Sequence, residues 1–376
     1  FPFLLFISLA SFFSAILNSH NKFGVAAASP ILLNLILIFI VLLEKNSSDK
    51  LAIYLSYGVS VAGLIQLIFV YFFAKKYFKP NMNFKFKITK KIKIFFGKFL
   101  PGIFSSGVTQ INILIGTIIA SFQASAVSYL YYADRIYQIN LAIAGIAIGT
   151  VILPNLSRHI KTGNKNKINF IQNKAFELCL FLSLPASMAL VVGSEEITSA
   201  LFGYGAFDIL SVTNSAKALY YFALGLPAFA LIKVFSTFLF ARDNTKTPFY
   251  FSLISVLINV LISILFFNKI GFIIIPIATT ISSWINALLL FFKLYLNKYF
   301  SLKNILNFQN LKIILVSVIS IYIFNILLSS SGNYLIYESE FKLFTIILLV
   351  IITILIYIFI SLLTKTFKSS DIKLKY

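Results

Sequence analysis

The sequence predicts an all-α integral membrane protein with about eleven transmembrane helices. Of its 376 residues, 59% are hydrophobic and 11% are charged, whereas a soluble globular protein carries about 25% charged residues. The apolar runs are also long, because residues 270–292 and 343–363 contain no charged side chain. A helix of ~20 apolar residues crosses the ~30 Å hydrocarbon core of a bilayer. Both runs are therefore expected to span a membrane.

The other spans follow from further apolar runs that are separated by charged breaks. Several runs contain proline, which membrane helices tolerate because neighbouring helices satisfy the freed backbone groups. We expect Pro30, Pro101, Pro185 and Pro227 to kink or begin helices. The first run lacks the basic segment of a signal peptide, so we interpret it as a truncated transmembrane helix. The expected helices cover residues 1–18, 25–43, 51–74, 96–120, 126–154, 170–193, 214–241, 248–267, 270–292, 311–329 and 342–364.

Basic residues alternate between the loops that connect these helices. One set of alternate loops, together with the C-terminal tail, holds most of the lysines and arginines. The other set holds only Lys45, Lys50, Lys217, Lys269 and Lys342, and most of the carboxylates lie on this lysine-poor side. Basic loops stay in the cytoplasm of membrane proteins. The net charge of +21 therefore reflects membrane topology and indicates anionic membrane lipids as partners, and nucleic acid is excluded.

One long basic segment, residues 75–98, is expected to link three helices to the eight that follow. Phe84, Phe86 and Ile88 alternate with polar residues in it. The segment fits the cytoplasmic membrane surface, where each lysine contributes about 1 kcal/mol of attraction to anionic lipid. It fits a solvated linker equally well.

The motifs of catalysis and of metal binding are absent from the sequence. The single cysteine, Cys179, excludes a disulfide framework, and the two histidines, His20 and His159, lie far apart without ligand spacing. The sequence has no phosphate-binding loop, no HExxH and no GxSxG. We therefore predict a protein that is not an enzyme and needs no cofactor, and whose energy source is a gradient or a partner.

Four ionisable residues fall inside the predicted helices: Asp134, Arg135, Glu177 and Lys233. Such residues are costly in a bilayer and indicate function. Asp134 and Arg135 lie about ten residues into their helix, ~15 Å deep. Adjacent residues on a helix do not face each other, so each needs another partner, or water in a cavity. A structural ion pair between helices is the alternative. Lys233 and Glu177 lie nearer the cytoplasmic ends, where lysine can snorkel, and are weaker candidates.

Several motifs, spread over most of the chain, resemble those of the MurJ (MviN) lipid II flippases. The resemblance rests on Tyr129-Leu-Tyr-Tyr-Ala-Asp-Arg-Ile-Tyr-Gln138, Gly145-Ile-Ala-Ile-Gly-Thr-Val-Ile-Leu-Pro-Asn-Leu-Ser-Arg-His159, Phe1-Pro-Phe-Leu-Leu-Phe-Ile-Ser8, Leu17-Asn-Ser-His20, Leu201-Phe-Gly-Tyr-Gly-Ala-Phe207 and Ala241-Arg-Asp-Asn-Thr-Lys-Thr-Pro248.

The resemblance implies a two-lobed architecture of the exporter superfamily that includes the MATE transporters. Members have fourteen helices, built as two lobes of six and two further helices, and this chain would lack the first three. Residues 1–74 would then complete the N-terminal lobe, 75–98 would form the cytoplasmic linker, 99–297 the C-terminal lobe, and 298–376 the two further helices with a basic tail. The last two helices would form a groove for a polyprenyl tail.

The resemblance also implies a function, which is the flipping of lipid II across a bacterial inner membrane by alternating access. Arg135 matches an arginine of the family's central cavity, with Asp134 beside it, and Lys233 is a further candidate for this cavity. The family's other cavity arginines lie in helices that are absent here, so this chain alone should not transport. The cell-wall synthesis machinery is an expected partner.

Some members of the family bind sodium, but this sequence departs from their pattern. Gly116 stands where those members have a carboxylate, and Ser263 stands where a second carboxylate occurs. Asn259 and Thr279 fit other ligand positions. Without a carboxylate little would offset the dehydration of sodium, so no metal is expected.

Two other functions fit the sequence less well than the flippase. A drug or polysaccharide-lipid exporter of the same superfamily usually stops at twelve helices, so the apolar runs at 311–329 and 342–364 argue against it. A non-transporting scaffold gains nothing from charges at mid-membrane depth, so Asp134 and Arg135 argue against that.

The charge pattern predicts a definite topology, which cysteine labelling can test. Residues 75–98, 155–169 and 365–376 should be cytoplasmic, and 195–213 and 330–341 periplasmic. In a variant with Cys179 replaced, a cysteine at position 208 should react with an impermeant maleimide only from the periplasmic side. Labelling of that position only from the cytoplasm would show that the helix count is wrong.

Overall fold

The computed structural model describes residues 2–20, 22–44, 48–78, 92, 110–141 and 147–366. The chain divides into two compact units, Phe1–Lys90 and Lys91–Tyr376. Every regular element among the described residues is a helix, which confirms the predicted fold class. The expected linker 75–98 falls largely outside the described residues, and its arrangement stays a prediction.

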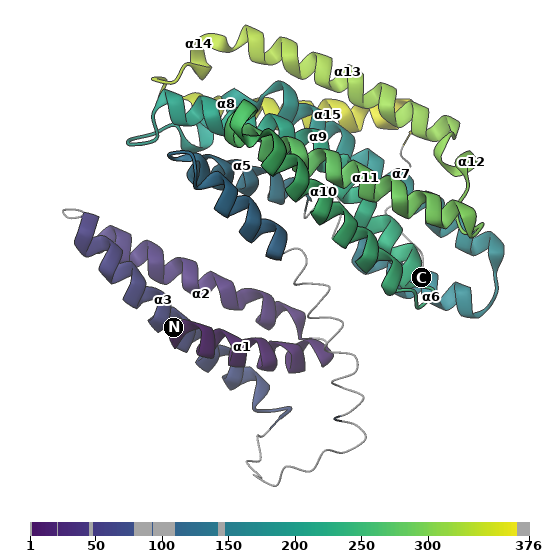
Figure 1. Ribbon diagram of the computed structural model, residues 1–376, viewed down its shortest axis with the longest axis horizontal. Coiled ribbons are helices and arrows are strands. Elements are labelled where there is room, and N and C mark those ends of the chain that lie inside the picture. Colours follow the sequence, from purple (N-terminus) through teal and green to yellow (C-terminus); the bar gives the residue numbers. More distant parts are fainter. Residues whose placement is uncertain are drawn as a thin grey trace. The chain divides into compact units, whose positions relative to one another are not determined.

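The first unit consists of three helices, which are the purple helices of Figure 1: α1 (Pro2–Ser19), α2 (Phe23–Leu43) and α3 (Ser48–Ala74). Helix α3 packs against both of the others. Leu17, Val70 and Ala74 form its small buried core. Most other large apolar side chains of these helices are exposed, as expected for surfaces that face lipid tails. All three helices agree with the predicted ranges.

The second unit surrounds one long central helix, α9 (Ile209–Phe240). Helices α5, α7 and α11 pack directly against α9. In the most apolar 18-residue segment of α9, 78% of the residues are buried. The other described helices of the second unit are Gln110–Ala120, α5 (Ala126–Leu141), α6 (Ala147–Lys161), α7 (Lys165–Val192), α8 (Ser194–Phe202), α10 (Lys246–Ile270), α11 (Ile274–Leu296), α12 (Leu302–Ile305), α13 (Phe308–Ser330), α14 (Gly332–Leu335) and α15 (Lys342–Leu363).

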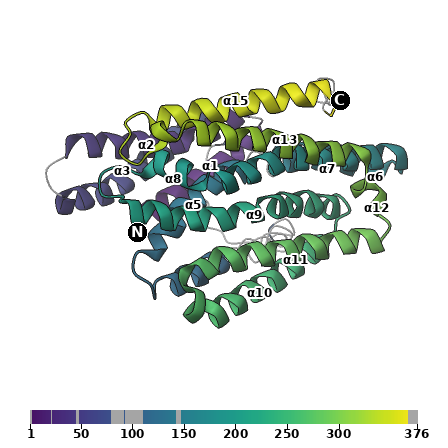
Figure 2. The ribbon, with the colours of Figure 1, turned by 90° about the horizontal axis from the view of Figure 1, so that it is seen from above.

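Helices α13 and α15 lie side by side along one face of this unit (Figure 2). Helix α13 also packs against α7, and α15 packs against α8. At one end of the pair the Nζ of Lys312 donates to the carbonyl oxygen of Thr364 at 3.1 Å, and Gln309 donates to that of Thr366. These contacts join the start of α13 to the end of α15, so the two helices are antiparallel.

Some predicted helix ends were wrong, because polar caps extend the helices beyond the apolar runs. Helix α7 begins at Lys165, where Asn164 accepts a hydrogen bond from the Lys167 N–H at 3.1 Å. Helix α9 begins at Ile209, where Asp208 accepts from the Ser211 N–H at 2.8 Å. Hydrogen bonds from the Ser211 side chain and backbone hold the pKa of this exposed carboxyl below its ordinary value. Capping residues lie outside the apolar period, so hydropathy misses them.

Two further predicted segments differ from the described helices, and two others lie partly outside the described residues. The predicted loop 155–169 is largely helical, because α6 continues to Lys161 before α7 begins. The predicted helix 126–154 corresponds to α5 and α6, and residues 142–146 between them lie outside the description, as does most of the predicted start of helix 96–120. Helix α8 was not predicted, since its two glutamates made the segment resemble a loop.

Seven helical stretches among the described residues are long and apolar enough to cross a membrane. One of them, Lys246–Leu296, contains two helices, α10 and α11. The Ser255 hydroxyl donates to the Ser282 carbonyl at 2.9 Å and Asn259 donates to Thr279 at 3.1 Å, so these helices run antiparallel. The predicted number of about eleven spans stays a prediction.

Gly271 forms the turn between α10 and α11. Its φ of 75° lies in the left-handed region, which glycine adopts without steric cost. A Cβ at this position would also lie 2.9 Å from Oε1 of Gln123, the atom that accepts a hydrogen bond from the Phe272 N–H at 2.8 Å. A side chain here would disturb both the turn and this contact.

Prolines inside two helices leave backbone carbonyls without their usual partners. A proline has no N–H to donate to the carbonyl four residues earlier. Pro227 in α9 therefore frees the carbonyl of Ala223, and the Ser187 hydroxyl of α7 donates to it at 2.6 Å. Pro185 in α7 frees the carbonyl of Phe181, and the Tyr357 hydroxyl of α15 donates to it at 2.8 Å. Each kink is thus satisfied by a neighbouring helix.

Helix α11 contacts the same turn of α9 that precedes Pro227. The Thr280 hydroxyl donates to the Tyr221 carbonyl at 2.6 Å, and Nε1 of Trp284 donates to the Leu224 carbonyl at 3.1 Å. Gly225 permits this approach, since a Cβ there would lie 2.7 Å from the Thr280 oxygen. Three side chains from two helices therefore fix the kinked turn.

We predict that Ser187→Ala destabilises the protein by about 0.6 kcal/mol and at most about 1.7 kcal/mol, the mean and the maximum measured for hydrogen bonds between membrane helices. The change leaves the Ala223 carbonyl unpaired. The free energy of unfolding in mixed micelles measures the effect. Ser329→Ala is the matched control, because the exposed Ser329 hydroxyl donates only within its own helix, to Asn325. Equal effects of the two substitutions would contradict the role given to Ser187.

Candidate functional site

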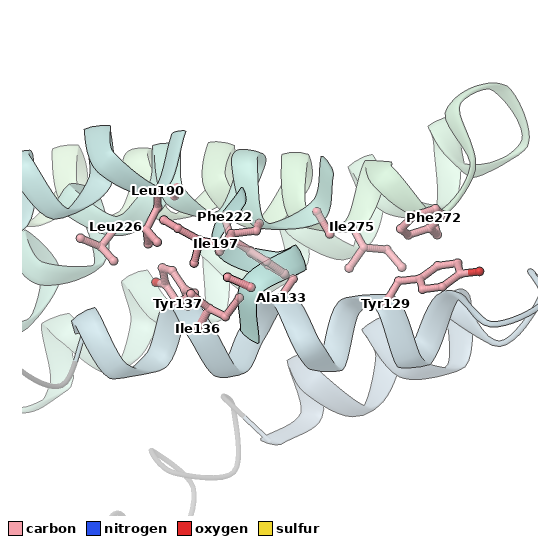
Figure 3. Close-up of a cluster of buried hydrophobic side chains, with 14 of the residues drawn as sticks. Tyr129, Ala133, Ile136, Tyr137, Leu190, Ile197, Phe222, Leu226, Phe272 and Ile275 are labelled. Carbon is pink, nitrogen blue, oxygen red and sulfur yellow. The ribbon is translucent and has the colours of Figure 1, made fainter. Parts of the chain in front are cut away.

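Helix α5, which carries the predicted charged pair, is fixed by a buried core. Ala133, Ile136 and Tyr137 point from α5 toward Phe222 and Leu226 of α9 (Figure 3). The rings of Tyr137 and Phe222 lie 5.7 Å apart. With this face held against α9, the rotation of α5 is set, and so are the directions of its other side chains.

Asp134 and Arg135 point in different directions, as adjacent helical residues do. Asp134 is half-buried and accepts a hydrogen bond from Nε2 of Gln138. Arg135 is exposed, and its guanidinium carbon lies 4.5 Å from the centre of the Tyr131 ring. No salt bridge of Arg135 is found among the described residues, and the salt bridge of Lys174 with Glu177 lies on another helix. The functional role of Arg135 and the alternative of an interhelical ion pair both stay predictions.

Asp134 lines a cavity of about 210 Å³ between the helix Gln110–Ala120 and helices α5, α10 and α11. Gly116, Asn259, Ser263 and Thr279, the residues considered for sodium, line the same cavity. The structure thus brings all of them together, and it adds Asp134. Helix α5 therefore adds a carboxylate to the lining of the cavity where Gly116 has none, and the expectation that no metal binds there stays a prediction.

The polar groups of this cavity already bind one another. Nδ2 of Asn259 donates to Oγ1 of Thr279 at 3.1 Å, and the Ser263 hydroxyl donates to Oδ1 of Asn259 at 3.2 Å. The Asp134 carboxylate accepts from Gln138. Among the described residues no group of three or more histidine, cysteine or carboxylate side chains is placed to hold a metal.

The two weaker candidates lie elsewhere. Glu177 of α7 pairs with Lys174 at 2.9 Å, one turn away on the same helix, so its charge has a structural explanation. Lys233 is exposed on α9 and does not line the cavity of Asp134. A role of Lys233 in binding stays a prediction.

A second cavity, of about 540 Å³, lies where α13 and α15 cover α5, α7 and α8. Its lining is almost entirely apolar and includes Leu182, Ala186, Phe324, Ile346 and Ile354. The groove for a polyprenyl tail at the last two helices stays a prediction, and this cavity is the place in the structure that would suit it. Sequence reasoning placed it only by family resemblance, since the apolar lining residues cannot be told from others that face lipid.

Comparison with known proteins decides the family. The family model of the lipid II flippase MurJ matches residues 1–345. The chain belongs to this family.

Individual relatives agree with the MurJ family model. The chain is 42% identical over 297 residues to a protein of Rhizobium meliloti (strain 1021) that is named probable lipid II flippase MurJ, covering 77% of this chain and 55% of that protein. It is 37% identical over 293 residues to the protein of the same name from Rickettsia prowazekii (strain Madrid E), covering 77% and 57%. The chain thus spans about half the length of these curated relatives.

A solved structure of lipid II flippase MurJ, in an inward closed conformation, is also similar. The TM-score is 0.76 at 27% identity, over 97% of this chain and 72% of that chain. The MurJ family and the fold class predicted from the sequence are confirmed. As a member of a transporter family with several apolar helices, the chain is a multi-pass protein of a bacterial inner membrane, and flippases are not a class of enzymes.

Proposed function

We propose that this chain is the larger part of a flippase that carries lipid II from the cytoplasmic to the periplasmic leaflet by alternating access. The observation that supports this most directly is Arg135, an exposed cation on α5, which lies in a run that the sequence predicts to span the membrane. Its nearest carboxylate is that of the adjacent Asp134, and no salt bridge of Arg135 is found among the described residues. Such a charge is costly at mid-membrane depth unless an anion or water meets it, and the substrate of the family carries an anion.

The chemistry of lipid II fits an arginine. The molecule has a diphosphate between an apolar polyprenyl chain and a polar sugar-peptide head. Arginine presents five N–H donors in a planar fork, stays protonated, and holds phosphate oxygens bidentately. The contact of Arg135 with the Tyr131 ring orients the guanidinium through a cation–π interaction, which uses none of its N–H donors.

Two further residues are proposed to act with Arg135. Lys233 lies seven residues before the end of α9 at Phe240, a rise of about 10 Å, on the side predicted to be cytoplasmic. It would attract the diphosphate on entry. Asp134 faces the neighbouring cavity and would keep the diphosphate on the Arg135 side of α5 by repulsion.

The apolar cavity beneath α13 and α15 is proposed to hold part of the polyprenyl chain. In this arrangement residues 1–74 belong to the N-terminal lobe, 75–98 to the linker, 99–297 to the C-terminal lobe and 298–376 to the two further helices and tail. Anionic membrane lipids and the cell-wall synthesis machinery are the proposed partners. Flipping makes and breaks no covalent bond, so the proposed protein is not an enzyme and needs no cofactor.

Arg135→Ala is predicted to abolish function in a full-length form, built to the length of the relatives. The measurement is complementation of a bacterium depleted of its lipid II flippase. Without the guanidinium, no described cation on α5 faces the diphosphate. Arg135→Lys should keep part of the activity, because a lysine still offers a point charge.

The matched control is Lys217→Ala, which removes an exposed cation near the start of α9 and should complement fully. Membrane abundance of each variant is measured by immunoblot. If the alanine variant at 135 accumulates normally and still complements, the diphosphate-binding role is wrong. If it is degraded, Arg135 has a structural role instead.

We also predict that transport does not depend strictly on sodium, because Gly116 offers no carboxylate and the side-chain oxygens of Thr279 and Asn259 already accept hydrogen bonds from Asn259 and Ser263. Transport in proteoliposomes should persist when sodium is replaced with potassium at constant membrane potential. Loss of transport in potassium, with Asp134→Asn removing the sodium dependence, would show that the cavity binds this cation through Asp134.

A further inference from the structure

The two charges of α5 contact two uncharged side chains that lie in opposite directions along the helix. The Arg135 guanidinium lies over the ring of Tyr131, which is four residues earlier. The Asp134 carboxylate accepts a hydrogen bond from Nε2 of Gln138, which is four residues later. From Tyr131 to Gln138 the helix rises by about 10 Å. These contacts therefore hold the two charges at different turns of α5.

Arg135 is the cation that the Asp134 carboxylate would approach if it were released. The charge of Arg135 already acts on this carboxyl. Among the described residues that line the cavity of Asp134, none is a lysine, an arginine or a histidine. Yet no salt bridge joins Asp134 to Arg135 in the described part of the chain. The hydrogen bond of Gln138 is thus made to a carboxylate that has a cation close by.

A shorter distance between Asp134 and Arg135 would weaken the binding of an anion to the guanidinium. The energy between two charges varies inversely with their separation, so a nearer carboxylate cancels more of the arginine's attraction and repels the anion more strongly. Gln138 is exposed, and its amide is the hydrogen-bond donor found for Asp134 among the described residues. Its side chain therefore sets where this carboxylate lies.

We propose that Gln138 is a positioning residue, which holds the Asp134 carboxylate away from Arg135 and so keeps the guanidinium available to an anion. The identity of the anion, the diphosphate of a lipid-linked substrate, rests on the proposed function. The position of the carboxylate rests on its hydrogen bond with Gln138 and on the separate contact of Arg135 with Tyr131.

Binding of farnesyl diphosphate to the full-length form in detergent micelles tests this role, with the affinity measured by calorimetry. Gln138→Leu removes the amide that donates to Asp134, and Asp134→Asn removes the charge that Gln138 would hold. The matched control is Gln110→Leu, at an exposed glutamine of the neighbouring helix that does not line the Asp134 cavity. Farnesol, which lacks the diphosphate, reports the binding of the chain alone.

Gln138→Leu should weaken the binding of farnesyl diphosphate about sixfold, the effect of letting an opposing charge approach from about 10 to about 6 Å at an effective dielectric constant of about 20. In the Asp134→Asn background the same substitution should leave the affinity unchanged, because the charge that opposes the anion is gone. Gln110→Leu should also leave the affinity unchanged, and no variant should alter the binding of farnesol.

An unchanged affinity in Gln138→Leu would overturn the positioning role. An equal loss in the Asp134→Asn background would overturn it too, because Gln138 would then act without Asp134. Arg135→Ala separates this inference from the proposed function. If Arg135→Ala leaves the binding of farnesyl diphosphate unchanged, the proposed role of Arg135 itself fails. If Arg135→Ala weakens binding and Gln138→Leu does not, only the positioning role of Gln138 fails.

Discussion

The arrangement of the second unit depends on where freed backbone carbonyls find donors. In a bilayer no water is available to pair them, and an unpaired carbonyl costs several kcal/mol. Pro227 and Pro185 each free one carbonyl, and each is met by a hydroxyl from another helix, Ser187 in one case and Tyr357 in the other. The two proline sites are therefore not independent features of single helices. They join α9 to α7 and α7 to α15, so the central helix and the covering helices are connected through two hydroxyl groups.

Much of the fold follows from hydropathy, because a membrane-spanning run is long and its signal is strong. The helix positions and Arg135 could be found in this way, since a charge in such a run is conspicuous. Hydropathy did not find the helix caps Asn164 and Asp208, because they are polar residues that bind only the first turn of their own helix. The pairing of Tyr357 with Phe181 could not be found either, because it depends on which helix lies beside α7. Pro185 did mark the carbonyl that needed a partner.

The cavity that Asp134 lines is the feature that the sequence could predict least. The depth of Asp134 in the membrane was predicted from its place in the run, but the cavity it faces depends on how α5 is rotated. That rotation is set by Ile136 and Tyr137, which are buried against α9. A signal was nevertheless present in the spacing of Asp134 and Gln138, which lie one turn apart and pair on one helix face. The family motifs could not show that Asp134 faces this cavity, because the members that bind sodium have their carboxylate at the position of Gly116, on a different helix.

The two cavities meet opposite faces of α5. Asp134 and Leu130 line the cavity of about 210 Å³, whereas Ile136 and Asn140 line the apolar cavity beneath α13 and α15. Residues 134 and 136 are about 200° apart round the helix axis, so α5 is the wall that the two cavities share. Arg135 lies between these faces and is exposed. In the proposed function, a substrate with an apolar chain and an adjoining diphosphate lies along α5, with its chain on one side and its charge at Arg135. Because α5 is one helix, a sideways shift of it toward one cavity moves its side chains away from the other.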